Sequence, residues 1–197
     1  MRTRVNRHNY GRLKVYFGPM FSGKSDYLHR DWDRARRGGL EVRAYKPAIH
    51  TRDGEFSKSR RGNSFPVEIV SSSSDLLDKD LVGVDLVIID EVQMFDMNLP
   101  FVVQRYRFSG ISVIVAGLAN DAFGNHFGPT LTLVANATEA EKLTAICQVC
   151  GYDGAEFTQM IDGQKRPILT LNRDSPIAIE SESISYEARC GRCFVSK

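Results

Sequence analysis

The octapeptide GPMFSGKS, residues 18–25, constrains the fold of this chain more than any other stretch. It has a glycine, four further residues and then glycine, lysine and serine, which is the full pattern of a phosphate-binding loop. It follows the apolar run at residues 13–17, which predicts a β-strand. In such a loop, backbone N–H groups and the positive end of the next helix surround a polyphosphate. We therefore expect a nucleoside triphosphate to bind here; the alternative is a strand-to-helix turn that binds nothing.

Two side chains of the loop have the chemistry that this ligand requires. Lys24 is expected to reach the β- and γ-phosphates. The Ser25 hydroxyl is expected to ligate Mg²⁺, because this small cation prefers oxygen ligands and bridges protein to phosphate. The expected cradle for ATP consists of Gly18, Pro19, Met20, Phe21, Ser22, Gly23, Lys24 and Ser25.

Strand-like and helix-like segments alternate along the chain up to about residue 138. Periodicity and capping residues predict helices at 25–37, 71–77, 99–108 and 129–135, and strands at 41–45, 67–70, 85–89 and 111–116. Residues 48–66 are rich in Arg, Lys, Ser and Gly, and we expect them to form a long functional loop. The alternation predicts an α/β fold with a mostly parallel sheet, whose ligand site lies at the carboxyl ends of the strands.

Two further segments follow strand ends and belong to the expected site. The apolar run at residues 85–89 ends in Asp90-Glu91. An acid at the carboxyl end of a buried strand can meet the Mg²⁺ beside a phosphate loop. Residues 117–128, GLANDAFGNHFG, form a second expected loop after the strand at 111–116.

All four cysteines fall in two pairs, Cys147-x-x-Cys150 and Cys190-x-x-Cys193. Two such pairs can hold one Zn²⁺ tetrahedrally through thiolates at about 2.3 Å, and a site closed by four thiolates is structural. The stretch between the pairs exceeds the roughly 15–20 residues usual for such sites. A redox pair or disulfide bonds are the alternative, although disulfides are rare in the cytoplasm.

Composition narrows the class of protein and its partners. With 42% hydrophobic and 25% charged residues, the chain has the composition of an ordinary globular protein. A net charge of +2 gives no reason to expect nucleic-acid or membrane binding. The first twelve residues hold four arginines and no acid, so we expect a solvated tail or an appended segment there. No apolar run approaches a secretory signal or the roughly 18 residues of a membrane span, and a cytoplasmic location is expected.

Six segments carry a resemblance to a known family. In chain order they are GPMFSGKS, KPAIHTRDG, DEVQMF, GLANDAFGNHFG, KLTAICQVCG and SYEARCGRC. From near Leu13 to the C-terminus the chain resembles the zinc-containing thymidine kinases of the cytosolic class, type II. The resemblance implies a RecA-like P-loop domain at residues 13–138. It also implies a small zinc domain with a lasso-like loop over the nucleoside, which the change in composition near residue 138 places at residues 139–197. The basic extension 1–12 precedes both domains.

The resemblance also implies an activity and an assembly. The family transfers the γ-phosphoryl group of ATP to the 5′-hydroxyl of thymidine with Mg²⁺, and deoxyuridine is expected as a second acceptor. The family's zinc is structural, and its members are commonly tetramers. A P-loop ATPase, or a nucleic-acid-binding module whose zinc knuckle touches DNA, is the competing interpretation of the same motifs. A third interpretation keeps the kinase fold and changes the acceptor nucleoside.

Individual residues take roles from the matching positions. Glu91 takes the position of the general base for the 5′-hydroxyl, and Asp90 that of the Mg²⁺-associated acid. Arg52 would clamp the transferring phosphates with its planar guanidinium, and Gln93 would join the nucleotide site. Residues implied around the nucleoside are Leu118, Phe123, Phe127, Ile179, Glu180, Ser181 and Tyr186.

Roles outside catalysis and substrate binding stay open for these residues. Glu91 could be a water-mediated Mg²⁺ ligand or a solvated acid, and Arg52 a solvated loop residue. The phenylalanines could simply be part of the core.

Overall fold

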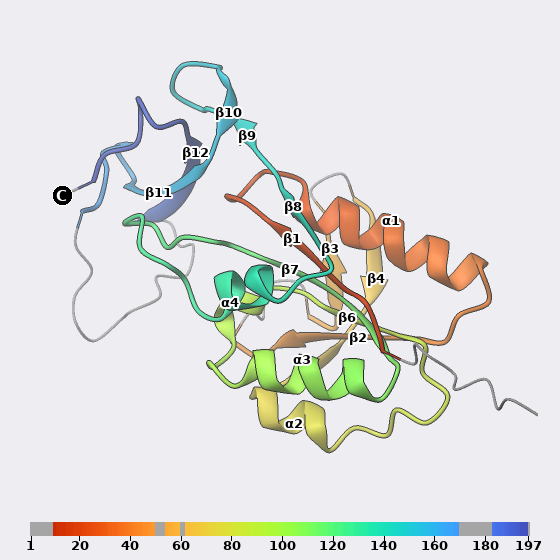
Figure 1. Ribbon diagram of the computed structural model, residues 1–197. Coiled ribbons are helices and arrows are strands. Elements are labelled where there is room, and N and C mark those ends of the chain that lie inside the picture. Colours follow the sequence, from red (N-terminus) through yellow and green to blue (C-terminus); the bar gives the residue numbers. More distant parts are fainter. Residues whose placement is uncertain (1–9, 50–53, 60–61, 170–182, 197) are drawn as a thin grey trace, which may run out of the picture.

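A six-stranded parallel sheet forms the centre of the computed structural model, which describes residues 10–49, 54–59, 62–169 and 183–196 (Figure 1). The strand order is β5-β2-β6-β7-β1-β8, and every pairing is parallel. The strands are β1 (Leu13–Phe17), β2 (Val42–Pro47), β5 (Glu68–Val70), β6 (Leu86–Ile89), β7 (Ser112–Gly117) and β8 (Glu139–Lys142). The predicted α/β class is confirmed.

Helices cover both faces of this sheet. They are α1 (Lys24–Arg37), α2 (Ser73–Leu77), α3 (Leu99–Phe108) and α4 (Thr130–Ala135), with a short 3₁₀ turn η1 (Val92–Met94). Leu28 of α1 packs with one set of strand side chains, whereas Leu76, Leu99 and Leu133 of the other three helices pack with the opposite set. Figure 1 shows α1 on one side of the sheet and α2, α3 and α4 on the other.

Side-chain alternation explains how one strand serves both layers. In β1, Leu13 and Val15 face the layer of α3, and Tyr16, the residue after Val15, faces the layer of α1. All four residues of β6 are buried because helices cover both of its faces. The sheet is therefore a rigid platform whose carboxyl edge can carry a site.

The C-terminal part of the chain forms two antiparallel pairs at one end of the sheet (Figure 1). One pair is β9 (Ala145–Ile146) with β10 (Asp153–Ala155), and the other is β11 (Phe157–Asp162) with β12 (Ile184–Arg189). Their small core contains Cys147 and Cys190 together with three alanines. This arrangement is consistent with the predicted small zinc-binding domain. The strand β8 pairs with β1 and connects the central sheet to these two antiparallel pairs.

The segment at residues 48–66 departs from the expected loop. It contains an antiparallel hairpin, β3 (Phe56–Lys58) with β4 (Ser64–Pro66), in which Ser57 stands opposite Phe65. Phe65 is 1% exposed and stacks on Trp32 of α1, with ring centroids 5.7 Å apart. Strands of three residues are too short to show periodicity, and this aromatic contact across the fold holds the hairpin in place.

The helices of the described part of the chain do not include one that is both long and apolar enough to cross a membrane. The longest, α1, has 14 residues and carries four arginines.

Candidate nucleotide and zinc sites

The loop between β1 and α1 has the conformation of a cradle. Gly23 precedes the helix with φ 83°, a left-handed conformation that favours glycine. The Lys24 ammonium group donates to the carbonyl oxygens of Gly18 and Pro19, at 3.1 and 2.6 Å. The lysine therefore folds over the loop whose backbone would surround a phosphate.

Burial and nearby acids shift the pKa of Lys24 in opposite directions. Desolvation lowers the pKa of Lys24 to about 8, against the carboxylates of Glu91 and Asp90, which raise it. The interaction with both acids places the end of β6 beside the phosphate loop. A phosphate group would stabilise the charged form of Lys24 in the same way.

The zinc domain holds the phosphate loop from the other side. The Met20 amide donates to Thr158 Oγ1 of β11 at 2.9 Å, and Thr158 is buried. Phe21 packs against the small core that contains Cys147 and Cys190. A Cβ atom on Gly18 would lie 2.2 Å from the Leu143 carbonyl oxygen, so only glycine fits at this crossing.

Asp90 and Glu91 follow β6 directly. Asp90 is 6% exposed, and its two carboxylate oxygens accept hydrogen bonds from the Glu91 amide at 2.9 Å and from Ser57 Oγ at 2.5 Å. Glu91 has a left-handed backbone, with φ 53°, which is uncommon outside glycine and is often found at functional sites. The backbone therefore turns sharply at Glu91, directly after the end of β6.

Gln93 connects this turn to the second loop. The side chain is 2% exposed; its Nε2 donates to Glu91 Oε2 at 2.5 Å, and its Oε1 accepts from the Leu118 amide at 2.9 Å. The glutamine thus orients Glu91 and also fixes the start of the loop after β7. It was predicted as part of the nucleotide site, and its contacts place it between the acid and the second loop.

The second loop, residues 117–128, closes on itself and reaches the zinc domain. Leu118 is buried, and Phe123 and Phe127 are half-buried. The carboxylate of Asp121 accepts from the amides of Phe123 and Asn125 at 2.9 Å, and the Phe127 amide bonds to the Ala119 carbonyl oxygen. A Cβ on Gly124 of this loop would lie 3.4 Å from a ring carbon of Phe194 in the zinc domain.

The remaining predicted nucleoside residues divide into two groups. Tyr186 is half-buried in β12 and pairs with Met160 of β11. Ile179, Glu180 and Ser181 lie outside the described residues, and so does Arg52, which was predicted to clamp the transferring phosphates.

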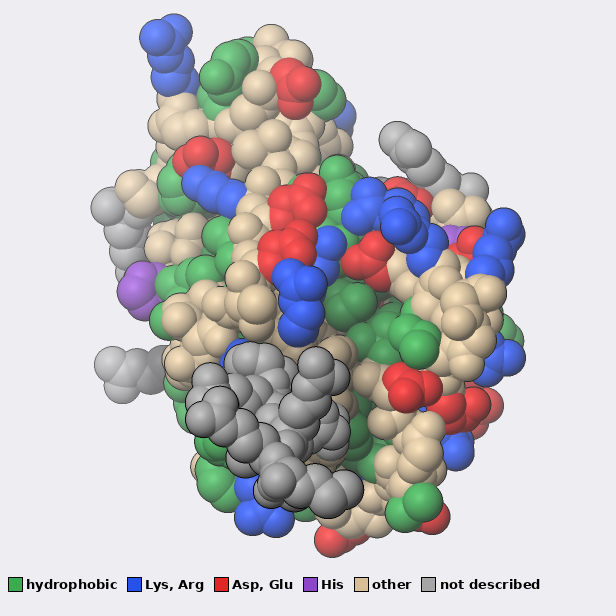
Figure 2. All heavy atoms as spheres, turned by 45° about the vertical axis from the view of Figure 1, so that its right-hand side comes forward, with side chains coloured by type: hydrophobic (Ala, Val, Ile, Leu, Met, Phe, Trp, Pro, Cys, Tyr) green, Lys and Arg blue, Asp and Glu red, His purple; other side chains and the backbone are tan. Residues whose placement is uncertain are grey.

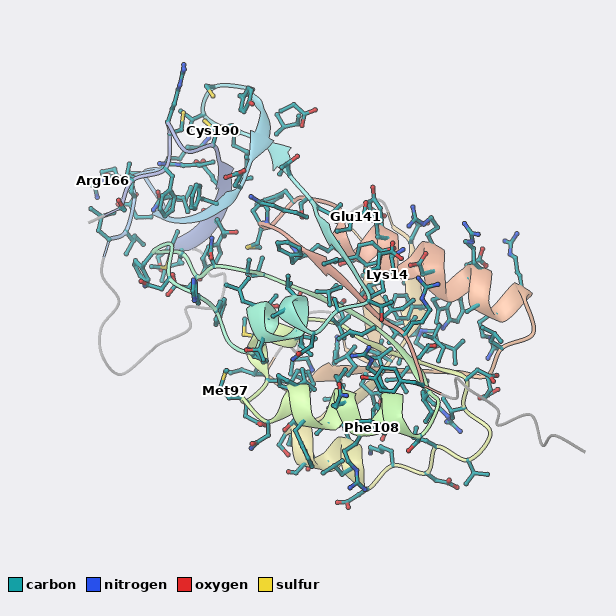
Figure 3. All side chains as sticks on the ribbon, in the orientation of Figure 1. Lys14, Met97, Phe108, Glu141, Arg166 and Cys190 are labelled. Atoms are coloured by element: carbon teal, nitrogen blue, oxygen red, sulfur yellow. The ribbon has the colours of Figure 1, made fainter. Side chains whose placement is uncertain are left out.

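The four cysteines gather at one point of the C-terminal domain, where Figure 3 labels Cys190. Their sulfur atoms all lie within 4.8 Å of one another. The Cys150 and Cys190 sulfurs are 3.7 Å apart, far beyond the roughly 2.05 Å of a disulfide bond. Desolvation raises the pKa of the Cys147 thiol, but hydrogen bonds from the backbone amides of Cys190 and Cys150 outweigh it and lower this pKa to about 6. Four sulfur atoms this close together fit a structural zinc ion.

Two residues of the site escaped sequence reasoning. Thr158 lies in an ordinary strand sequence, FTQMID, and Ser57 in the segment expected to be a loop. Each acts through one hydrogen bond to a residue far away in the chain, and no local pattern signals such a bond.

Comparison with protein-family models gives a match to the thymidine kinase family over residues 11–194. The matched region spans β1 to the last cysteine pair and thus includes the phosphate loop, the Asp90-Glu91 turn and the four-sulfur cluster. The chain therefore belongs to the thymidine kinase family.

Proposed function

We propose that this protein transfers the γ-phosphoryl group of ATP to the 5′-hydroxyl of thymidine, giving thymidine monophosphate and ADP. One observation carries the proposal: Glu91 lies between the two loops. Its charge acts on Lys24 of the phosphate loop, and its carboxylate is held by Gln93, which also bonds to Leu118 at the start of the second loop. A base at that position can serve an acceptor held by one loop and a phosphate held by the other.

Each residue then has a defined part in the reaction. Lys24 binds the β- and γ-phosphates and offsets their charge. Glu91 accepts the proton of the 5′-hydroxyl as that oxygen bonds to the γ-phosphorus and the bond to the ADP oxygen breaks. Phosphoryl transfer depends mainly on positioning and electrostatics, so the fixed geometry of Glu91 matters as much as its basicity.

Ser25 and Asp90 are the residues that would hold Mg²⁺. Both offer oxygen ligands, which this cation prefers, and the charge of Asp90 acts on Lys24 beside the phosphate loop. When bound with ATP, Mg²⁺ neutralises charge that develops on the phosphate oxygens.

The face shown in Figure 2 gives the nucleic-acid interpretation little support. On the face in Figure 2, Lys and Arg side chains are interspersed with Asp and Glu. Several of them pair directly, such as Lys142 with Glu156 at 3.0 Å and Arg37 with Asp33 at 3.0 Å. A DNA-binding face needs a basic stripe that tracks phosphates.

The acceptor series is expected to run thymidine, then deoxyuridine, then deoxycytidine. Loss of one methyl group from an apolar pocket costs about 1–3 kcal/mol. Deoxycytidine should be much poorer, because its exocyclic amine presents a donor where thymidine presents an acceptor. ADP and nucleoside monophosphate should be measured together with each nucleoside, with single-stranded DNA and with no acceptor. ADP formation stimulated by DNA, without thymidine monophosphate, would overturn the proposal.

Gln93→Met removes both hydrogen bonds of this side chain at similar volume. Leaving the Leu118 amide unsatisfied and Glu91 unoriented should cost about 1–3 kcal/mol, or roughly 10- to 100-fold in kcat/KM for thymidine. Gln104→Met is the control, since Gln104 lies on α3 and bonds to Tyr10. Equal kinetics for the two variants would exclude the positioning of Glu91 by Gln93.

Four further expectations stay predictions. They are the tetramer, the cytoplasmic location, deoxyuridine as a second acceptor and the division at residue 138. Light scattering of the purified protein measures the first of them directly.

A further inference from the structure

The hairpin β3–β4 reaches the site through one buried hydroxyl. Ser57 is 3% exposed, and its Oγ donates to Asp90 Oδ2 at 2.5 Å. The other carboxylate oxygen of Asp90 accepts the Glu91 amide at 2.9 Å. Each oxygen of this carboxylate therefore has a donor that fixes its direction, one from the adjacent backbone and one from a segment 33 residues away.

Contacts from two other elements hold Ser57 in place. The Lys46 ammonium group, 2% exposed at the end of β2, donates to the Phe56 carbonyl oxygen at 2.9 Å. Phe65, opposite Ser57 in the hairpin, stacks on Trp32 of α1. Since β2 and α1 also flank the site, the hydroxyl is fixed relative to Asp90 by the same framework that carries the phosphate loop.

We propose that Ser57 is a positioning residue for the divalent-cation site at Asp90. The inference rests on the proposed function, in which Asp90 ligates Mg²⁺. A carboxylate oxygen can accept a hydrogen bond and ligate a cation at the same time, and a carboxylate with a fixed orientation loses less rotational freedom when the metal binds. Loss of such a hydrogen bond to a ligand typically lowers metal affinity by about 10- to 100-fold.

Two other roles for Ser57 predict different behaviour. A hydroxyl that contacts the phosphates directly would contribute to ATP binding with or without metal. A purely structural hydroxyl would lower the melting temperature and leave the effect of Mg²⁺ on ATP binding unchanged. The positioning role acts through the metal, so it changes only the part of the ATP affinity that depends on Mg²⁺.

The experiment measures the dissociation constant of ATP by calorimetry, once with excess Mg²⁺ and once with EDTA. The ratio of these two dissociation constants is then compared between variants. Ser57→Ala should reduce the Mg²⁺-dependent gain in affinity by about tenfold or more and leave the metal-free value unchanged. Ser57→Thr keeps a hydroxyl at a strand position that tolerates threonine and should retain most of the gain.

Ser59→Ala is a matched control in the same hairpin. The Ser59 hydroxyl is buried and has no hydrogen-bond partner within the described residues, so its loss should leave the ratio unchanged. The proposal is overturned if Ser57→Ala weakens ATP equally with and without metal, or if Ser59→Ala has the same effect. It is also overturned if the gain stays at the wild-type value in Ser57→Ala.

The outcome is separable from that of the acceptor assay, because no nucleoside is added. A protein that fails to phosphorylate thymidine can still show the metal-dependent difference between Ser57→Ala and Ser59→Ala. If the wild-type protein binds ATP equally well with and without Mg²⁺, the role of Ser57 is overturned, whichever nucleoside the protein phosphorylates.

Discussion

Lys24→Ala is expected to lower kcat/KM for ATP by on the order of 10²–10³-fold, the usual effect of removing one preorganised charge from a transferring phosphoryl group. The Lys24 ammonium group lies over the loop carbonyl oxygens of Gly18 and Pro19, where it can exchange these contacts for phosphate oxygens. Thymidine binding should be nearly intact, because the second loop is fixed by Gln93. Initial rates and nucleoside binding by calorimetry separate the two effects.

Glu91→Gln is the partner variant in the same experiment. It should keep both ligands bound and lower kcat by roughly 10²–10⁴-fold, because a base acts in the transition state. Lys79→Ala serves as the control, since that lysine pairs with Glu68 at the edge of the sheet. Unchanged kcat in Glu91→Gln would show that this residue is not the base. Unchanged ATP kinetics in Lys24→Ala would show that the lysine does not bind the transferring phosphate.

Cys150→Ser and Cys193→Ser are expected to abolish zinc binding and the folded structure of β9 to β12. The wild-type protein should contain close to one zinc per chain, because four sulfurs within 4.8 Å form one closed site. Zinc contributes about 10–16 kcal/mol of apparent binding free energy at such sites, and this is largely folding free energy. Elemental analysis and hydrogen exchange of the C-terminal strands measure the two losses.

Val149→Ser is the matched control for the cysteine variants. Val149 lies in the same knuckle, is 56% exposed and offers no sulfur ligand, so its replacement should keep the metal. ATP affinity should also fall when zinc is lost, because Met20 and Phe21 of the phosphate loop contact the zinc domain. Protein purified without chelator that contains no zinc and has paired disulfides would contradict this account of the cysteines.

The parts of the site that sequence reasoning predicted are those with a local signature. The phosphate loop, the acid after β6 and the cysteine pairs each place their chemistry within eight residues or fewer. Residues of this kind are recognisable because the backbone next to them sets their geometry. β6 was predicted for a related reason, since burial on both faces requires a continuous apolar run.

The parts that escaped prediction depend on distant partners. β8 has the sequence EAEK, which is mostly exposed and has no apolar alternation, and it is a strand because its backbone pairs with β1. The hairpin β3–β4 is held by Phe65 against α1 and by Lys46 of β2. Tertiary contacts override weak local preferences at such positions.

The position of β1 in the sheet also bears on how the chain folds as it is synthesised. β1 is the first strand among the described residues, yet its two neighbours are β7 and β8, and the Leu13 amide bonds to Thr138 Oγ1 across 125 residues. Parallel pairing over such separations pays a large loop-closure entropy before any contact forms, which slows folding. The strand that carries the phosphate loop can therefore pair with β7 and β8 only after residues 112–142 have left the ribosome.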